Sequence, residues 1–198
     1  MIIGITGGTG CGKTTALQTI ESLGGVIIDC DKVYHHLLLT DKAMLSAIEN
    51  QFPGTVKDFV LDRKNLAAIV FSNSQALEDL NTITHGAVKA KVLEILDNKP
   101  ALVAIDAIAL FESGLHKLCD VTVAVTAPEN VRVQRLMERD NITQQQAAMR
   151  IQAQKTQEYF AKNCDYILEN NDTQEIFQEK CLAFFQNLLT IKEKSKGV

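Results

Sequence analysis

The stretch with the clearest chemical potential is GGTGCGKT at residues 7–14. It matches G-x-x-x-x-G-K-[ST] at every fixed position, a pattern whose glycines let backbone N–H groups close around phosphate oxygens. Lys13 adds a mobile positive charge for the β- and γ-phosphates, and the Thr14 hydroxyl is a suitable ligand for Mg²⁺. We therefore predict a phosphate-binding loop made by Gly8, Thr9, Gly10, Cys11, Gly12, Lys13, Thr14 and Thr15.

Two carboxylates, Asp29 and Asp31, come directly after the apolar residues 26–28. Open α/β sheets bind ligands at the carboxyl ends of their strands, so these acids are well placed to hold Mg²⁺ or accept a hydroxyl proton. The simpler interpretation is that Asp31 is the N-cap of a helix that begins near Lys32. We predict a catalytic role for at least one of the two acids.

A third acid, Asp106, closes the apolar segment 101–105. An apolar strand that ends in a carboxylate resembles the Walker B element of phosphate-loop proteins, whose acid supports Mg²⁺. We predict Thr14 and Asp106 as the metal ligands of the site.

Arginines concentrate in the expected helix 129–139, where Arg135 and Arg139 are four residues apart and share a face. Arginines on a mobile helical pair are what a phosphoryl-transfer lid needs, because the charge of the transferring group must be met as water is excluded. The alternative is surface charge pairing with Glu138 and Asp140. We predict that Arg135 and Arg139 contact ATP.

The elements that must position these residues alternate between short apolar strands and helices. The expected strands are residues 1–5, 26–28, 101–105, 121–125 and 166–168. Residues 32–98 are predicted to be almost wholly helical, more than a sheet crossover needs. We predict a single α/β domain over residues 1–198, a three-layer P-loop NTPase fold with a five-stranded parallel sheet flanked by helices. The expected parts are a core (about 1–31, 100–134 and 164–192), an acceptor-binding helical insert (about 32–99) and a lid (about 135–163).

The composition excludes several kinds of partner. A net charge of −4 argues against a broad nucleic-acid surface, and no apolar run approaches the length of a membrane span. The five cysteines are odd in number and lack a C-x-x-C pair, which indicates reduced thiols and a cytoplasmic protein. Oxidation of Cys11 could block nucleotide binding, but a small loop residue is the simpler interpretation. The oligomeric state stays open.

The motifs of other phosphate-loop classes are missing. A GTPase switch needs N-K-x-D and a D-x-x-G after the Walker B strand, but Asp106 is followed by Ala107-Ile108-Ala109. Motor ATPases usually have Asp-Glu at the end of that strand. The short chain, the helical insert and the arginine-rich helices favour a small-molecule kinase.

The sequence resembles the dephospho-CoA kinase family from residue 3 to about residue 172. The matching segments are GITGGTGCGKTT and IIDCDKV near the start, LDRKNLAAIVF at 61–71, the neighbourhood of His85, LFESGL at 110–115, RLMERDNIT at 135–143, RIQAQ at 150–154 and DYILEN at 165–170. The resemblance implies transfer of the γ-phosphate of ATP to the ribose 3′-hydroxyl of dephospho-CoA, the last step of coenzyme A biosynthesis, with Mg²⁺ as cofactor.

The resemblance also implies roles for individual residues. Asp31 corresponds to the base that accepts the hydroxyl proton, Asp29 to its partner or a metal-side ligand, and Lys13 and Arg139 to further catalytic residues. Arg135 and Arg139 correspond to lid arginines. The acceptor side corresponds to Asp31, Arg63, His85, Leu110, Phe111 and Glu112.

The chain departs from the family pattern on the acceptor side. The family often has His-Pro-Leu-Ile-Arg where this chain has His85-Gly86-Ala87-Val88-Lys89, and lysine lacks the bidentate fork of arginine. Two other functions stay open. One is a kinase of another small alcohol or nucleoside, and the other is a non-catalytic nucleotide-binding regulator.

Overall fold

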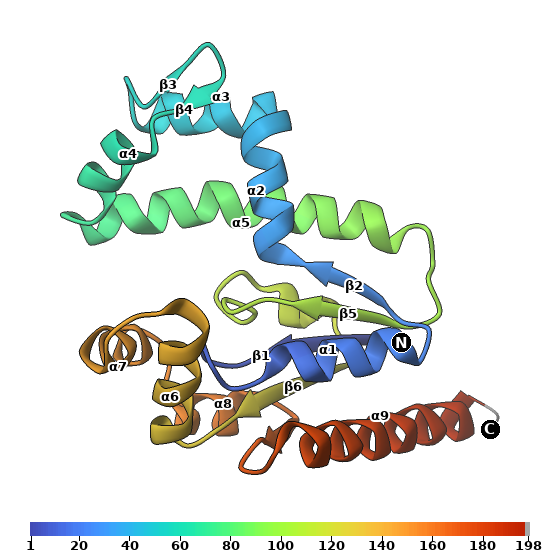
Figure 1. The fold of residues 1–198 in the computed structure, drawn as a ribbon. Coiled ribbons are helices and arrows are strands. Elements are labelled where there is room, and N and C mark those ends of the chain that lie inside the picture. The colour runs from blue at the N-terminus through green and yellow to red at the C-terminus, as the bar shows by residue number, and fades with distance from the viewer. Residues whose placement is uncertain (197–198) are drawn as a thin grey trace. The chain divides into compact units, whose positions relative to one another are not determined.

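The computed structural model describes residues 1–196, so the last two residues of the predicted domain lie outside the described residues. Its centre is a five-stranded sheet in the order β2-β5-β1-β6-β7 (Figure 1). The strands are β1 (Ile2–Thr6), β2 (Val26–Asp29), β5 (Val103–Asp106), β6 (Val121–Thr126) and β7 (Tyr166–Glu169). β1 pairs in parallel with β5 and with β6, and β6 pairs in parallel with β7. The predicted α/β class and parallel sheet are confirmed.

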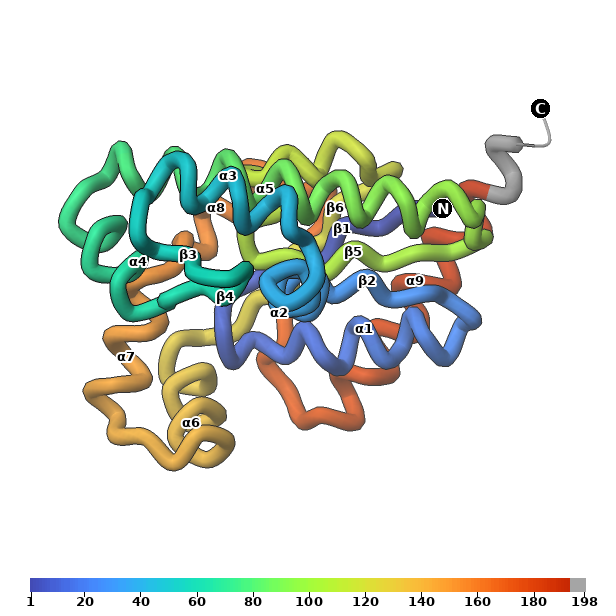
Figure 2. Tube along the Cα trace, turned by 90° about the horizontal axis from the view of Figure 1, so that it is seen from above, coloured from blue at the N-terminus to red at the C-terminus, as the bar shows by residue number. Residues whose placement is uncertain are grey.

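The chain divides into two compact units. The first comprises residues 1–27, 100–110 and the chain from His116 onward, and the second comprises residues 28–99 and 111–115. The helices of the first unit are α1 (Lys13–Ser22), α6 (Glu129–Asp140), α7 (Gln144–Gln152), α8 (Gln157–Asn163) and α9 (Gln174–Lys196). Within this unit α1 packs against α9, and α6 and α7 lie side by side (Figure 2).

The second unit is built on the long helix α5 (Ser74–Leu96). Helices α2 (Cys30–Thr40), α3 (Lys42–Gln51) and α4 (Arg63–Val70) all pack against α5. Side-chain caps begin these helices as the sequence indicates: Asp62 accepts hydrogen bonds from the N–H groups of the first turn of α4, and Asn73 does the same for α5.

The prediction of an almost wholly helical stretch over 32–98 is wrong between α3 and α4. There β3 (Val56–Lys57) and β4 (Val60–Leu61) form an antiparallel hairpin. The two turn residues, Asp58 and Phe59, have φ of 51° and 61°. Two-residue hairpin turns are usually recognised in a sequence by Asn-Gly or Asp-Gly, because these residues tolerate positive φ. The turn here is Asp-Phe, which is not such a pattern.

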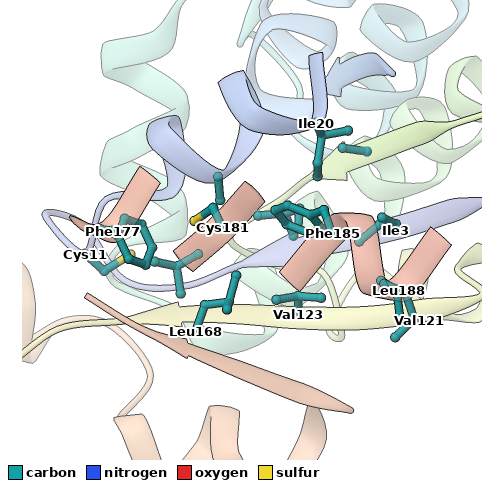
Figure 3. Packing of buried hydrophobic residues seen from close by; sticks show 14 of the residues in the cluster. Ile3, Cys11, Ile20, Val121, Val123, Leu168, Phe177, Cys181, Phe185 and Leu188 are labelled. Carbon is teal, nitrogen blue, oxygen red and sulfur yellow. The ribbon is translucent and has the colours of Figure 1, made fainter. Parts of the chain in front are cut away.

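The core of the first unit explains why the strand sequences are apolar without alternation. Consecutive residues, which point to opposite faces, are buried in both central strands: Ile3 to Thr6 in β1 and Val121 to Thr126 in β6. Phe177, Cys181 and Phe185 of α9 pack into the same core, and Cys11 of the phosphate loop lies there too (Figure 3). The loop is therefore joined to the core by one of its own side chains.

No helix within residues 1–196 is both long and apolar enough to cross a membrane.

Replacing Phe185 with alanine should destabilise the protein strongly, because the ring is fully buried on α9. We expect Phe185→Ala to lower the free energy of unfolding by about 3–5 kcal/mol, the usual range for a buried phenylalanine. Leu182→Ala on the same helix is the control, since its side chain is 38% exposed. Urea unfolding of both variants measures the difference, and equal losses would contradict the packing described here.

Candidate active site

The loop between β1 and α1 has the backbone that a phosphate cradle requires. Gly7, Gly10 and Gly12 have positive φ, and Gly12, at 98°, is the N-cap residue of α1. A Cβ on Gly12 would clash with the side-chain amide of Asn170. Glycine is needed here for conformation and for space, and the positive end of α1 points at any anion bound in the loop.

The lysine of the motif is held by the predicted Walker B acid. Lys13 Nζ donates to Asp106 Oδ1 at 2.8 Å, and both side chains are largely buried. The other carboxylate oxygen of Asp106 makes no hydrogen bond with a residue that the structure describes. Together with the exposed Thr14, it forms a donor set that suits Mg²⁺, which keeps most of its waters and takes few protein ligands.

Three side chains hold the backbone carbonyls of residues 9–11. Arg132 donates from Nε to the first carbonyl at 2.8 Å. Arg135 donates from Nη1 to the second at 3.3 Å, and Asn170 donates from Nδ2 to the third at 2.9 Å. Arg135 also donates from Nη2 to Asn170 Oδ1 at 3.2 Å, so two of these side chains support each other.

The loop opens onto a hollow of about 350 Å³. Lys13, Thr14, Arg135 and Arg139 line it together with the loop glycines. Thr15 lines a neighbouring hollow of the same size with Asn170, so the structure brings together most of the predicted phosphate-binding residues. Cys11 differs, because its side chain is buried in the core.

The burial of Cys11 bears on its redox chemistry. Burial raises the pKa of this thiol, and the nearby charges of Lys13 and Arg132 offset that only in part. The thiolate is the reactive form of cysteine, so the structure favours Cys11 as a small packed residue.

The two predicted lid arginines differ in their partners. Arg139 donates to Asp140 from Nε at 2.7 Å and from Nη2 at 3.0 Å, and Arg150 also pairs with Asp140. The surface-pairing alternative is therefore observed for Arg139, which also lines the hollow. Arg135 makes no pair with Glu138, which instead accepts a hydrogen bond from Gln134.

Asp29, the last residue of β2, and Asp31 in the first turn of α2 belong to the second unit and make different contacts. Asp29 is the N-cap of α2: Oδ1 accepts the Lys32 N–H at 2.9 Å, and Oδ2 pairs with Lys32 Nζ at 3.2 Å. The interpretation of Asp31 as the cap is wrong, because α2 begins at Cys30, two residues before the expected start. Asp31 lies exposed in the first turn, and its carboxylate makes no hydrogen bond or ion pair with any described residue.

The protonation state of Asp29 follows from its contacts with Lys32. Partial burial raises the pKa of its carboxyl, but the hydrogen bonds and charge of Lys32 outweigh burial and lower the pKa below its usual value. Asp29 is therefore a fixed carboxylate at neutral pH.

A second hollow, of about 620 Å³, lies within the second unit. His85 and Lys89 of α5 line it together with Glu112 and Ser113. Burial lowers the pKa of His85, and the carboxylate of Glu112 acts in the opposite direction. Two predicted acceptor-side residues, His85 and Glu112, therefore share one polar hollow.

The other acceptor-side candidates lie elsewhere. Leu110 is fully buried in the first unit, where it packs beside Gly4. Phe111 belongs to the second unit and is half-buried. Arg63 is exposed at the start of α4, where its charge offsets the effect of burial on the pKa of Tyr34.

Three residues that hold the loop, Arg132, Gln154 and Asn170, are missing from the predicted site. Gln154 Oε1 accepts the Thr9 N–H at 2.7 Å. Asn170 directly follows β7, but the polar residue that comes directly after the expected strand 166–168 is Glu169. The signal that singled out Asp29 and Asp106 would therefore have selected Glu169, and Gln154 lies in a connection without such a signal.

Comparison with known proteins shows the family of the chain. A model of the dephospho-CoA kinase family matches residues 1–175. A dephospho-CoA kinase from Pseudoalteromonas translucida is 32% identical over 98% of this chain and 93% of its own length. The solved dephospho-CoA kinase from Campylobacter jejuni superposes with a TM-score of 0.67 at 27% identity, covering 94% of this chain and 96% of that one. A shikimate kinase from Acinetobacter baumannii shares the fold, with a TM-score of 0.53 at 18% identity over 96% of this chain and 94% of its own. The chain therefore belongs to the dephospho-CoA kinase family.

Proposed function

We propose that this protein transfers the γ-phosphate of ATP to the ribose 3′-hydroxyl of dephospho-CoA, giving CoA and ADP with Mg²⁺ as cofactor. The observation that carries the proposal is the family match over residues 1–175, which includes the phosphate loop with its lysine in place. The reaction is the last step of coenzyme A biosynthesis. The five free cysteines support a cytoplasmic location.

In this proposal the first unit binds ATP. The loop N–H groups and the N-terminus of α1 hold the phosphates, and Lys13 moves its charge from Asp106 to the β- and γ-phosphates. Thr14 and Asp106 would hold Mg²⁺, which neutralises charge that develops on the phosphate oxygens. Arg139 would turn from Asp140 toward the transferring group as water is excluded.

Asp31 is the better candidate for the base. A general base needs an unoccupied carboxylate within hydrogen-bond reach of the hydroxyl. Both oxygens of Asp29 are engaged by Lys32, whereas the carboxylate of Asp31 has no such partner among the described residues. Asp29 then fixes the start of α2, and with it the position of Asp31.

The second unit would bind the acceptor. The hollow lined by His85 and Glu112 supports this part of the proposal, and we retain Arg63, Leu110 and Phe111 as further candidates. In domain terms, residues 32–99 form the acceptor-binding insert and residues 135–163 the lid of one kinase domain.

The test of the function is an ADP-release assay with ATP, Mg²⁺ and dephospho-CoA, followed by mass spectrometry of the product. We expect a product one phosphate heavier than dephospho-CoA, formed only when the acceptor and Mg²⁺ are both present. ADP release without that product would indicate another acceptor. Nucleotide binding without ADP release would indicate a regulator.

Removing the proposed base should abolish most of the turnover. We expect Asp31→Asn to lower kcat by at least ~100-fold, the lower range for loss of a general base, with the Kd for ATP little changed. Asp58→Asn is the matched control, because Asp58 is an exposed acid of the same unit at a turn that asparagine tolerates. Turnover near the wild-type rate in Asp31→Asn would exclude Asp31 as the base.

The two acids can be separated at position 29. Asn caps helices about as well as Asp, so Asp29→Asn should keep the melting temperature near wild type while it removes the charge. We expect a smaller loss of kcat than in Asp31→Asn. Thermal unfolding and steady-state kinetics measure the two effects, and a larger loss of kcat in Asp29→Asn would make Asp29, not Asp31, the base.

Loss of the motif lysine should be the most severe change. Lys13→Ala removes a charge aimed at the transferring phosphate, so we expect activity to fall by about a thousandfold or more. Lys117→Ala removes an exposed lysine of the same unit and should leave activity unchanged. Steady-state rates at saturating ATP decide, and a Lys13→Ala protein with wild-type activity would mean that ATP binds elsewhere.

A further inference from the structure

The conformation of the phosphate loop depends on side chains outside its motif. In a planar trans peptide the carbonyl and the next N–H point in opposite directions. Holding the carbonyls of residues 9–11 therefore directs the N–H groups of residues 10–12 away from the side chains that hold them, and of these N–H groups that of Cys11 donates to the Gly8 carbonyl at 3.3 Å. Arg132, Arg135 and Asn170 provide these three contacts.

Arg132 is the buried cation among the three. Its residue is 6% exposed, and its guanidinium occupies the space beside Gly8, where a Cβ would clash with Nη2. Burial lowers the pKa of this guanidinium, and the nearby Cys11 and Glu129 oppose that shift. A buried cation is costly unless its hydrogen bonds are satisfied, so its contacts are strongly specified.

Gln154 completes a closed set of contacts around one residue, Thr9. Its Oε1 accepts the Thr9 N–H at 2.7 Å and a hydrogen bond from Arg132 Nη2 at 3.3 Å. Arg132 Nε in turn holds the Thr9 carbonyl. Thr9 is therefore fixed on both its N–H and its carbonyl by two side chains that also contact each other.

The position of Gln154 in the chain connects Thr9 to the proposed lid. Gln154 lies in the connection between α7 and α8, within the proposed lid, and Arg132 lies on α6 just before it. Both side chains belong to the same unit as the loop. The shape of the loop is thus tied to the position of the lid segment through Thr9.

We infer that Arg132 and Gln154 are positioning residues for phosphoryl transfer, which set the direction of the loop N–H groups through their contacts with Thr9. The expected effect on the KM for ATP rests on the proposed function. The expected effect on the Kd for ADP concerns the loop alone and does not require that function.

The first test compares nucleotide and acceptor parameters in Arg132→Ala and Gln154→Ala. We expect the Kd for ADP and the KM for ATP each to rise about tenfold, the value of one hydrogen bond to a charged group, while the KM for dephospho-CoA stays within about twofold. Arg132→Lys keeps the charge but lacks the fork, so it should recover only part of the loss. A purely structural role would lower the melting temperature and leave the Kd and both KM values unchanged.

A second test reaches the same contact from the loop side. Gly8→Ala should displace the Arg132 guanidinium and raise the Kd for ADP to the level of Arg132→Ala. The double variant should bind ADP no more weakly than Arg132→Ala, because both changes remove one contact. Additive losses would contradict the inference.

Gln152→Ala is the matched control for Gln154→Ala, because it removes an exposed glutamine two residues away. We expect wild-type Kd and KM values for it. Folded Arg132→Ala and Gln154→Ala proteins with ADP affinity within about twofold of wild type would overturn the inference. If wild type formed no CoA while these variants lost ADP affinity, the proposed function would fail and the inference would stand.

Discussion

The phosphate binding that we propose depends on one constraint, the direction of a few backbone N–H groups. A glycine-rich loop cannot fix that direction itself, because glycine has the largest conformational freedom to lose. Here one motif residue, Cys11, is buried in the core, and side chains from outside the motif, on α6 and on the residue after β7, hold the loop carbonyls. The sheet and its helices position those side chains, so the loop depends on the whole first unit.

Much of the fold could be predicted because its signals are local. Runs of apolar β-branched residues mark buried parallel strands, and each predicted strand agrees with an observed one, with the carboxyl ends one residue further along. The β3–β4 hairpin could not be predicted, because its turn places Phe59 at positive φ. That conformation is unfavourable for a bulky residue and is decided by contacts of the surrounding chain.

The same distinction between local and distant information applies to the site. The motif residues are contiguous, and their roles follow from spacing. Arg132, Gln154 and Asn170 meet the loop across separations of more than a hundred residues, which no local pattern reports. The N-cap of α2 shows that a local signal can also be too coarse. The sequence pointed to Asp31, but α2 begins two residues earlier and Asp29 is the cap, which leaves the carboxylate of Asp31 unoccupied.

We propose above all that the loop N–H groups receive the nucleotide phosphates. Titration of ¹⁵N-labelled protein with ADP and Mg²⁺ measures this directly through the backbone amide resonances. We predict that the resonances of Gly10, Gly12 and Lys13 shift most, with an affinity that matches calorimetry. If these resonances stayed in place while amides confined to α2–α5 of the second unit shifted, the loop would not be the nucleotide site.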